Sequence, residues 1–435
     1  MKKYYIITYG CQMNVYDSHL MEYLLEKDGF KKTDDIKKAD AIIVNTCAVR
    51  EHAVERAISR LKSLKYMKKE KPNLRIGLTG CIPQHKKEKL LEIIPFVDFI
   101  IGPDKYKNIV STVSGTNGTF LGFNDTEIYS DLIPARGNFP EAFVSAMRGC
   151  NNFCSYCVVP YTRGKERSRN IADILTEIKK LADTGYKRVI LLGQNVNNYN
   201  YNGNRLPHLL SKVAAIDGIQ RIGFLTSHPA YFPIEVIDIM KEEKKIEKYL
   251  HLPVQSGSTR ILKLMKRGYT KEEYLNLINS IRNKIPDIAL STDIIVGYPT
   301  EKERDFLETL ELIKSVRFDF AYMFKYSVRE MTLASIFPDD VTDEIKQKRL
   351  KKLIQIQNDI TKQKSFATKN KIFDVLIVEK NKKNSLESDG ITVYNKRVIV
   401  KGEFNKGELV PVKINDIQGW TPIGIPHYKY GISRT

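Results

Sequence analysis

The six cysteines have the clearest capacity for chemistry in this sequence, and they fall into two sets of three. In residues 147–169, MRGCNNFCSYCVVPYTRGKERSR, Cys150, Cys154 and Cys157 form a C-x3-C-x2-C pattern. A structural zinc site normally closes with four protein ligands, but the chain has no seventh cysteine and no histidine close to this set. Thiolates also hold iron–sulfur clusters, so the pattern predicts a cubane with three protein ligands and one iron open to a substrate.

The other set, Cys11, Cys47 and Cys81, repeats one local context: IITYGC, IIVNTC and IGLTGC. Each cysteine directly follows a predicted parallel strand. Because the carboxyl ends of parallel strands share one edge of a sheet, we expect these three thiols to meet. The alternative is three buried cysteines acting as small apolar side chains, but their common position at strand ends favours a second metal site.

The first part of the chain, residues 1–135, alternates short apolar runs with segments of helical periodicity. This alternation predicts a parallel sheet covered by helices. The predicted strands cover 4–10, 41–46, 75–80 and 98–102, and the predicted helices cover 17–28, 51–69 and 85–94.

The rest of the chain predicts two further domains, which give an α/β protein overall. Residues 136–369 hold six apolar runs separated by helices, which indicates a partial (β/α)6 TIM-like barrel with its chemistry at the carboxyl ends of the strands. A long basic helix is expected over 342–369. Residues 370–435 alternate apolar and polar positions between turns, which is typical of a small antiparallel β-barrel of about five strands. The predicted strands of the central barrel lie near 143–148, 188–193, 221–226, 249–254, 289–296 and 320–326.

Polar residues at the ends of the predicted barrel strands are candidates for binding a cofactor. The alternative for each is loop capping or turn formation. The candidates are Gln194 and Asn195 after the second strand, Gln255 and Ser256 after the fourth, and Asp293 and Gly297 in the fifth.

The charge and hydropathy of the chain restrict its partners. Its 70 Lys and Arg against 51 Asp and Glu give a formal charge of +19, which favours a nucleic-acid partner. A generally basic proteome is the alternative. No apolar run reaches the roughly 20 residues that span a bilayer, and the N-terminus reads as a strand and not as a signal peptide. We therefore expect a cytoplasmic protein without membrane contact.

The C-x3-C-x2-C pattern at the end of the first strand of a β/α barrel resembles the radical S-adenosylmethionine (SAM) superfamily. Over its whole length the chain resembles the methylthiotransferases of that superfamily. Their order of domains is the same, ending in an RNA-binding β-barrel called TRAM. The stretches TYGCQMNVYDS, NTCAVRE, GCNNFCSYCVVPYTRGKERSR, LLGQNVNNY and HLPVQSGSTRILKLMKRGYT are most similar to the MiaB-type branch, which acts on N(6)-dimethylallyladenosine in tRNA.

This resemblance implies two 4Fe-4S clusters and SAM as cofactors. Cys150, Cys154 and Cys157 would hold the cluster that cleaves SAM, and Cys11, Cys47 and Cys81 would hold an auxiliary cluster that presents sulfur. The implied reaction is methylthiolation of carbon 2 of the modified adenosine at tRNA position 37. The implied partners are the tRNA anticodon stem-loop and a low-potential electron donor such as flavodoxin or ferredoxin, and the implied state is a monomer.

Two further sets of residues carry expectations. Arg163, Lys165, Arg167 and Arg169 border the second cysteine set, and we expect them to meet tRNA phosphates or position the cofactor, with a solvated loop as the alternative. In the C-terminal barrel, several lysines and aromatic residues, Phe404 among them, are candidates for RNA contact. Trp420 is expected to be buried.

Two stretches depart from the family pattern and leave its substrate open. FKYSVREMTLAS (324–335) lacks the usual Pro and Gly, and VGYPTEKE (296–303) has Thr300 in place of a Gly. Alternative substrates are threonylcarbamoyl-adenosine in tRNA and an aspartate of a ribosomal protein. From other classes of protein, an iron–sulfur electron carrier and a zinc-dependent RNA-binding protein are the alternatives.

Overall fold

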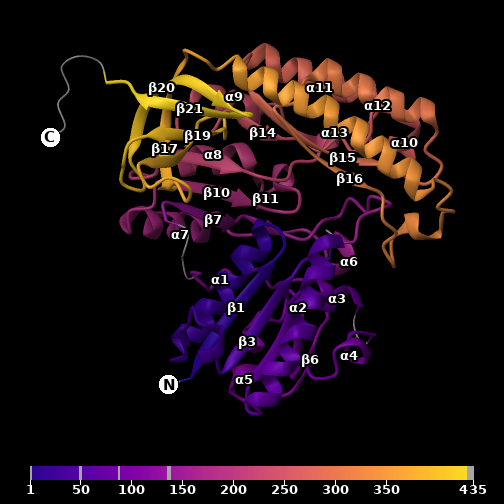
Figure 1. The fold of residues 1–435 in the computed structure, drawn as a ribbon, viewed down its shortest axis with the longest axis vertical. Helices are drawn as coiled ribbons and strands as arrows, with labels where there is room; N and C mark the ends of the chain where they lie inside the picture. The colour runs from indigo at the N-terminus through magenta and orange to yellow at the C-terminus, as the bar shows by residue number, and fades with distance from the viewer. Residues whose placement is uncertain (1, 49–50, 87–88, 135–138, 429–435) are drawn as a thin grey trace.

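The structure, a computed structural model, describes residues 2–48, 51–86, 89–134 and 139–428 of the 435-residue chain. The N-terminal part lies at one end of the molecule, the central part adjoins it, and the C-terminal barrel packs on another side of the central part (Figure 1). None of the helices in these described segments is long and apolar enough to span a membrane.

The N-terminal part is a six-stranded parallel sheet in the order β2-β1-β3-β4-β5-β6, as the strand–helix alternation predicts. Strand β3 is buried throughout because helices cover both faces: Ile43 faces one apolar core and Val44 the other. Helix α1 begins at Gln12, earlier than predicted, directly after Cys11. The strands are β1 (Lys3–Tyr9), β2 (Lys31–Lys32), β3 (Ala41–Thr46), β4 (Arg75–Gly80), β5 (Phe99–Ile101) and β6 (Gly118–Phe120), and the helices are α1 (Gln12–Lys27), α2 (Glu51–Glu70), α3 (Cys81–Lys86), α4 (Lys89–Ile93) and α5 (Ile109–Ser114).

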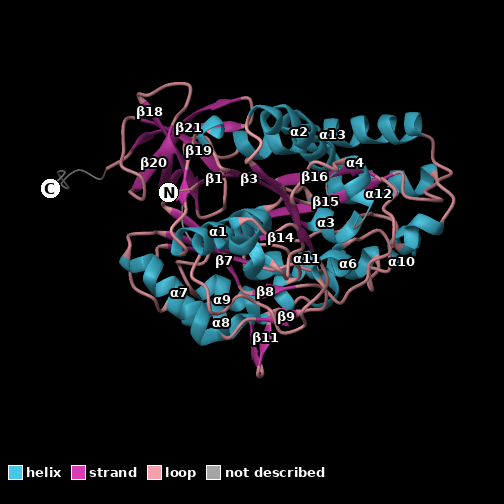
Figure 2. Ribbon diagram, turned by 90° about the horizontal axis from the view of Figure 1, so that it is seen from below, coloured by secondary structure: helices cyan, strands magenta, loops and turns pink. Residues whose placement is uncertain are grey.

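The central part is an open barrel of six parallel strands with helices on its outside (Figure 2). Two three-stranded sheets, β13-β10-β7 and β14-β15-β16, are joined by a bridge between Ile222 and Ile246. This arrangement confirms the predicted partial (β/α)6 barrel. The strands are β7 (Glu141–Ser145), β10 (Arg188–Leu192), β13 (Arg221–Phe224), β14 (Tyr249–His251), β15 (Ala289–Val296) and β16 (Phe320–Lys325).

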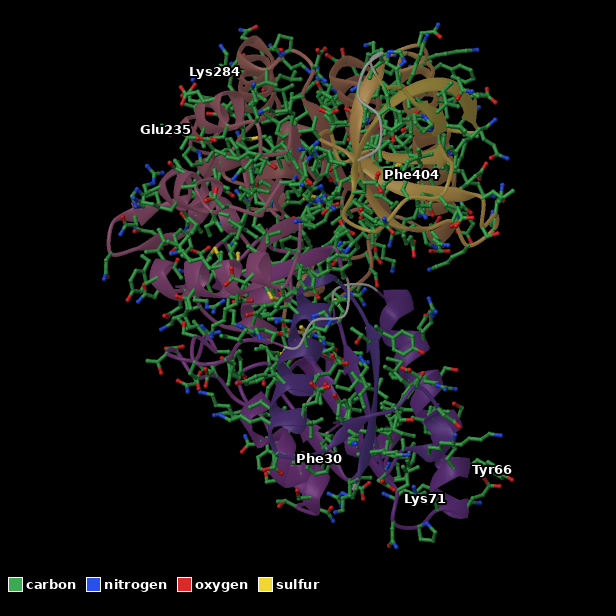
Figure 3. The ribbon with its side chains drawn as sticks, turned by 90° about the vertical axis from the view of Figure 1, so that its left-hand side faces the viewer. Phe30, Tyr66, Lys71, Glu235, Lys284 and Phe404 are labelled. Atoms are coloured by element: carbon green, nitrogen blue, oxygen red, sulfur yellow. The ribbon has the colours of Figure 1, made fainter. Side chains whose placement is uncertain are left out.

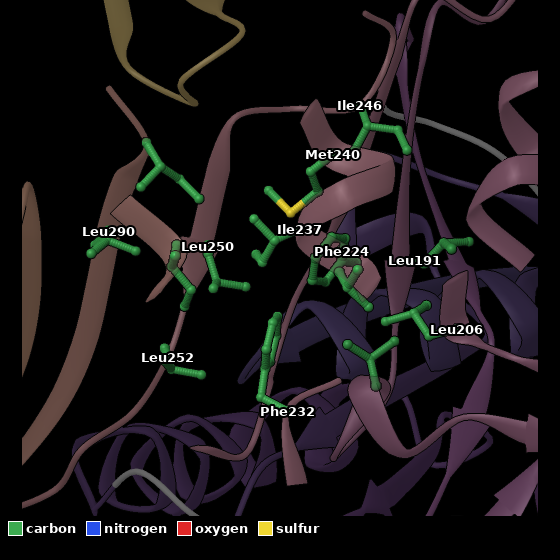
Figure 4. Close-up of a cluster of buried hydrophobic side chains, with 14 of the residues drawn as sticks. Leu191, Leu206, Phe224, Phe232, Ile237, Met240, Ile246, Leu250, Leu252 and Leu290 are labelled. Atoms are coloured by element: carbon green, nitrogen blue, oxygen red, sulfur yellow. The ribbon is translucent and has the colours of Figure 1, made fainter. Parts of the chain in front are cut away.

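The helices of the central part bury their apolar faces against these strands. Phe224, Ile237, Met240 and Leu250 lie together in this core (Figure 4). The main helices are α7 (Ile171–Asp183), α8 (Leu206–Ala214), α9 (Glu235–Glu242), α11 (Lys271–Lys284), α12 (Glu303–Val316) and the predicted long basic helix α13 (Asp343–Phe366); shorter elements near the cysteines are β8 (Met147–Arg148), α6 (Val159–Arg163), β9 (Arg167–Ser168) and α10 (Thr259–Leu264).

The C-terminal part is a closed five-stranded barrel in the order β17-β18-β19-β21-β20. Its pairings are antiparallel except for the parallel pair β19–β21. Trp420 is 55% exposed at the turn between β20 and β21, so the prediction that it is buried is wrong. Phe404 lies in the barrel core and is not available to stack on a base. The strands are β17 (Ile372–Lys380), β18 (Glu387–Thr392), β19 (Arg397–Lys401), β20 (Leu409–Gln418) and β21 (Thr421–Pro426).

The two outer parts contact opposite ends of the central strands. The C-terminal barrel contacts their amino ends: Lys248 N donates to Val393 O (2.8 Å), and Arg188 Nη2 donates to Asn395 Oδ1 (2.8 Å). The N-terminal part packs near their carboxyl ends, where Asp17 of α1 pairs with Arg148 of β8. Phe404 and Phe30 mark these two outer parts in Figure 3.

Candidate iron–sulfur sites

The first cysteine set lies at one edge of the N-terminal sheet. Cys47 and Cys81 directly follow β3 and β4, and Cys11 follows β1 after Gly10. These are neighbouring strands, so the structure brings the three residues together as expected. Gly80 makes this edge possible: it has a φ of +96°, and a Cβ there would lie 2.4 Å from Thr46 O. Only glycine fits so close to the neighbouring strand in this conformation.

The thiols of the first set differ in their electrostatics. A hydrogen bond with Cys47, aided by the Arg163 charge, lowers the pKa of Cys11 to about 6 against the opposing effect of burial. Cys11 also stands before the first turn of α1, where its Sγ donates to Asn14 Oδ1 (3.3 Å). Burial raises the pKa of Cys81, and Arg163 opposes that rise. This edge therefore already stabilises thiolate at one of its three positions.

Arg163 connects this set to the central part of the chain. Its Nε donates to Cys81 Sγ (3.2 Å), and its Nη1 lies 2.7 Å from Asp17 Oδ2. The Asp17 carboxylate also pairs with Arg148 and accepts from the Tyr106 hydroxyl (3.1 Å). The side chains of Asp17, Arg148 and Arg163 are at most 3% exposed. A buried network of charges thus joins the two parts of the chain beside Cys81.

The other two arginines of the same segment are structural. Arg167 pairs with Asp104 through two hydrogen bonds (2.7 and 3.1 Å), and Arg169 pairs with Glu177. Each guanidinium is nearly fully buried, so the expectation that these arginines meet tRNA phosphates is wrong. Of the four basic residues, Lys165 alone has an exposed side chain, 3.6 Å from Asp125.

The second cysteine set lies on one loop after β8. Gly149 opens the loop with a φ of +79°, and a Cβ there would lie 1.9 Å from Lys165 O, so the chain needs glycine before Cys150. Cys157 N donates to Cys154 O (2.9 Å), which closes a turn within the motif. Burial raises the pKa of Cys150 to about 11 and that of Cys157, which also faces the Cys154 charge, to about 12.

A buried arginine also serves the second set. Arg267 Nη1 donates to Cys154 Sγ (3.3 Å), while its Nη2 donates to Pro253 O (2.8 Å) and its Nε to the Tyr269 hydroxyl (3.0 Å). The residue precedes Gly268 in the stretch MKRGYT, three residues after α10 ends. Each set thus has one buried guanidinium that donates to one thiol.

The three thiols of each set and their surroundings fit an iron–sulfur cluster. All six cysteines are free of disulfides. Within the described segments, no three His, Cys, Asp or Glu side chains gather as the ligands of a single metal ion do. Thiolates around a cubane are spaced more widely, because each binds a different iron. Arg163 Nη2 is buried beside Cys81 without a hydrogen-bond acceptor among these residues, so a cluster sulfur would give it a partner.

Three of the candidate cofactor residues have side-chain contacts near the second set or with β14. Gln194 Oε1 accepts from Gly149 N (2.6 Å) and so supports the cysteine loop. Asn195 donates to Glu166 (3.1 Å), while its Oδ1 is buried without a described partner. The partly exposed Asp293 lies 3.5 Å from His251 Nε2.

The other three candidates are held in the loops that follow their strands. Gln255 has a φ of +74° and bonds through its backbone N to Asp293 O (2.9 Å). The Ser256 hydroxyl is buried and accepts from Ser258 N (3.2 Å). Gly297 packs against α13, where a Cβ would lie 2.3 Å from Lys346 Cγ. The recorded contacts of these three residues are therefore with neighbouring backbone and with α13.

The two departures from the family pattern both place a side chain in left-handed backbone. Thr300 has a φ of +64° and Met331 a φ of +70°. The loop that holds Met331 touches both cysteine sites: Ala334 N donates to Ser155 O (2.6 Å) within the second motif, and His85 of α3 bonds to Glu330 O (2.9 Å).

Asn14, Asp17 and Arg267 were not predicted as functional residues. Asn14 and Asp17 lie close to Cys11 in the stretch TYGCQMNVYDS, and Arg267 lies in HLPVQSGSTRILKLMKRGYT. Spacing alone cannot show that Arg267 reaches a thiol 113 residues away in the chain, since this contact depends on how the barrel closes.

Comparison with known proteins defines the class. Residues 144–313 match the model of the radical SAM superfamily, and residues 3–102 match a family described only as uncharacterized protein family UPF0004. The fold resembles that of TsrM from Kitasatospora setae, a radical SAM methyltransferase with bound cobalamin and a 4Fe-4S cluster (TM-score 0.58, 14% identity, 77% of each chain). The radical SAM enzyme OxsB is also similar (TM-score 0.54, 14% identity, 82% of this chain and 56% of that one). The chain is thus a radical SAM protein in which a parallel sheet precedes the central barrel.

Relatives of higher identity define the family. A tRNA-2-methylthio-N(6)-dimethylallyladenosine synthase of Thermoanaerobacter sp. is 44% identical over 97% of this chain and 92% of its own length. The synthase of the same name from Caldicellulosiruptor saccharolyticus is 46% identical over 92% of this chain and 87% of its own. That of Chlorobium phaeobacteroides is 42% identical over 98% and 97%. The chain belongs to the family of these radical SAM methylthiotransferases.

Proposed function

We propose that this protein methylthiolates carbon 2 of N(6)-dimethylallyladenosine at position 37 of tRNA. The observation that carries the proposal is the pair of three-cysteine sites, each with a buried arginine on one thiol. The Asp17–Arg163 pair joins the two parts of the chain that hold them. The alternative function, an iron–sulfur electron carrier, would not need a second cluster with an open iron beside one that cleaves SAM. The names of relatives that match nearly the whole chain support the substrate.

In this proposal, each cysteine set holds one 4Fe-4S cluster. Cys150, Cys154 and Cys157 bind the cluster that, with SAM, supplies a radical for the unreactive carbon–hydrogen bond. Cys11, Cys47 and Cys81 bind the auxiliary cluster that supplies sulfur. Around them, Gln194 orients the loop that begins at Gly149, and Asn195 Oδ1 offers a buried acceptor for SAM. Asp293 is a further candidate for SAM binding. Gln255, Ser256 and Gly297 shape the strand ends.

The proposed domains are 1–135, 136–369 and 370–435, and the third is a TRAM-like barrel that binds RNA. Because that barrel contacts the amino ends of the central strands, a tRNA that reaches both it and the cysteines must pass along the open central barrel. The edge strand of the central barrel, β16, exposes Phe320, Tyr322 and Phe324 at alternate positions of one face, where they can stack on bases.

The cytoplasm is the proposed compartment, the chain acts as a monomer, and flavodoxin or ferredoxin is the electron donor.

The test is methylthiolation by the reconstituted full-length protein. Oxygen-free protein with iron, sulfide, SAM and a low-potential reductant is given tRNA that carries N(6)-dimethylallyladenosine, and nucleosides are measured by mass spectrometry. We expect the 2-methylthio product from this tRNA. A matched tRNA that carries threonylcarbamoyl-adenosine should stay unmodified; modification of that tRNA alone would move the assignment to the other substrate.

A further inference from the structure

The Arg163 guanidinium donates to a cysteine of the first set and belongs to the cysteine-bearing segment of the second. It lies six residues after Cys157, at the end of α6, yet its Nε donates to Cys81 Sγ of the N-terminal part (3.2 Å). It is 3% exposed, so water does not screen its charge. Asp17, 2.7 Å away, fixes its orientation and partly balances it.

We propose that Arg163 is a positioning residue that sets the reduction potential of the auxiliary cluster through the Cys81 thiolate. The inference rests on the proposed binding of a cluster by Cys11, Cys47 and Cys81. When such a cluster accepts one electron from a low-potential reductant, its negative charge grows by one. A buried guanidinium that donates to a ligand sulfur stabilises the more negative state and raises the potential.

Asp17 has the opposite effect because its carboxylate lies on the same guanidinium. Its negative charge disfavours the reduced cluster, and Arg148 and Tyr106 keep it in place from other sides. The pair therefore predicts two changes of opposite sign. Loss of Arg163 lowers the potential, and loss of the Asp17 charge raises it.

The segment also provides a matched control. Arg167 lies four residues further along, is similarly buried, and joins the same two parts of the chain through Asp104, but the structure gives it no contact with a thiol. Its Nη2 also donates to Arg163 O (2.9 Å), so replacement of Arg167 tests whether a weaker interface and a looser Arg163 backbone are enough to shift the potential. We expect no shift, because the Arg163 guanidinium keeps its contacts with Cys81 and Asp17.

The experiment compares R163M, R163K, D17N and R167M in the full-length reconstituted protein by redox titration followed by electron paramagnetic resonance. Added SAM perturbs the signal of the other cluster, and a C150A/C154A/C157A variant assigns the auxiliary signal. We expect a lower auxiliary potential in R163M, a smaller decrease in R163K, a higher potential in D17N, and no change in R167M.

An unchanged potential in R163M, or a shift of R163M and D17N in the same direction, would overturn the proposal. If R163M does not retain the cluster, the directions in which R163K and D17N shift the reduction potential decide whether the proposal holds. The failure of the proposed function looks different: the wild-type protein would then take up one cluster, and no auxiliary signal would exist to titrate.

Discussion

The two cysteine sets have the same number of thiols but are assembled in different ways. Cys150, Cys154 and Cys157 come from one loop, whereas the first set comes from the ends of three neighbouring strands. Their electrostatics also differ. The pKa of Cys11 is lowered to about 6, while those of Cys150 and Cys157 are raised to about 11 and 12 by burial. Cys11 therefore favours thiolate before metal binds, whereas Cys150 and Cys157 must lose protons as metal enters.

The arginines that serve the two sets differ in their counter-charge. Arg163 shares its charge with the Asp17 carboxylate, which comes from the other part of the chain. The recorded contacts of Arg267 are Cys154, a backbone carbonyl and tyrosine hydroxyls, with no carboxylate among them. The second site therefore surrounds its cluster with more positive charge. At the first site a carboxylate balances the arginine charge, and this ion pair links two domains.

Removal of one cysteine ligand from either set should abolish one cluster and leave the other in place. In the wild type we expect about eight iron and eight sulfide per chain, and about four of each in C154A or C81A. C154A should lose both SAM cleavage and methylthiolation. C81A should lose methylthiolation but still release 5′-deoxyadenosine from SAM.

Metal and sulfide analysis with product chromatography checks these values. The ligand assignment would be wrong if C81A kept the iron content of the wild type, and equal loss of SAM cleavage in both variants would contradict the separate roles.

Alkylation of the metal-free protein compares the thiols directly. Cys11 and Cys157 are both partly exposed, but their pKa values lie near 6 and 12. Only thiolate reacts, so at pH 7 iodoacetamide should modify Cys11 at least about tenfold faster, even after its weaker intrinsic nucleophilicity is taken into account. The rate at Cys11 should fall as the pH drops through 6, whereas the rate at Cys157 should still rise above pH 9.

Mass spectrometry of peptides gives the two rates over a series of pH values. Unfolded protein in denaturant is the control, because there both thiols should titrate near their ordinary pKa and react alike. Equal rates in the folded protein would show that the two sites do not differ.

Replacement of Arg267 tests the positive surrounding of the second site. R267M removes the donor to Cys154 and leaves Pro253 O and Tyr269 without their guanidinium partner. Loss of a residue that supports a metal ligand typically costs about 10- to 100-fold in metal affinity or activity. We expect a loss in that range in the rate of SAM cleavage, with a smaller loss in R267K.

Lys266 provides the control because it precedes Arg267 and is exposed. K266M should cleave SAM at the rate of the wild type. Measurement of iron retention alongside the rate separates loss of the cluster from a slower reaction, and a loss in K266M equal to that in R267M would contradict the role of Arg267.

The sequence predicted what depends on local pattern and missed what depends on closure of the fold. Strand ends could be placed from apolar runs, so the meeting of Cys11, Cys47 and Cys81 was predictable. The burial of Arg167 was not, because its partner Asp104 lies 63 residues away in the other part of the chain. Trp420 was misplaced for a related reason: strand periodicity does not show where a turn projects a side chain into water.

The loop after β16 touches both sites and allows the smallest test. Met331, 46% exposed, has a φ of +70°, which costs a side chain of the L configuration about 1–2 kcal/mol. M331G removes this strain but adds about 0.4–1 kcal/mol of conformational freedom to the unfolded chain. We therefore expect a net stabilisation of about 0.5–1 kcal/mol, measured as the free energy of unfolding of the metal-free protein in urea. M331A is the control, since alanine shortens the side chain and keeps the strain. If M331A stabilised the protein as much as M331G, the exposed methionine itself and not the backbone at this position would be the cause.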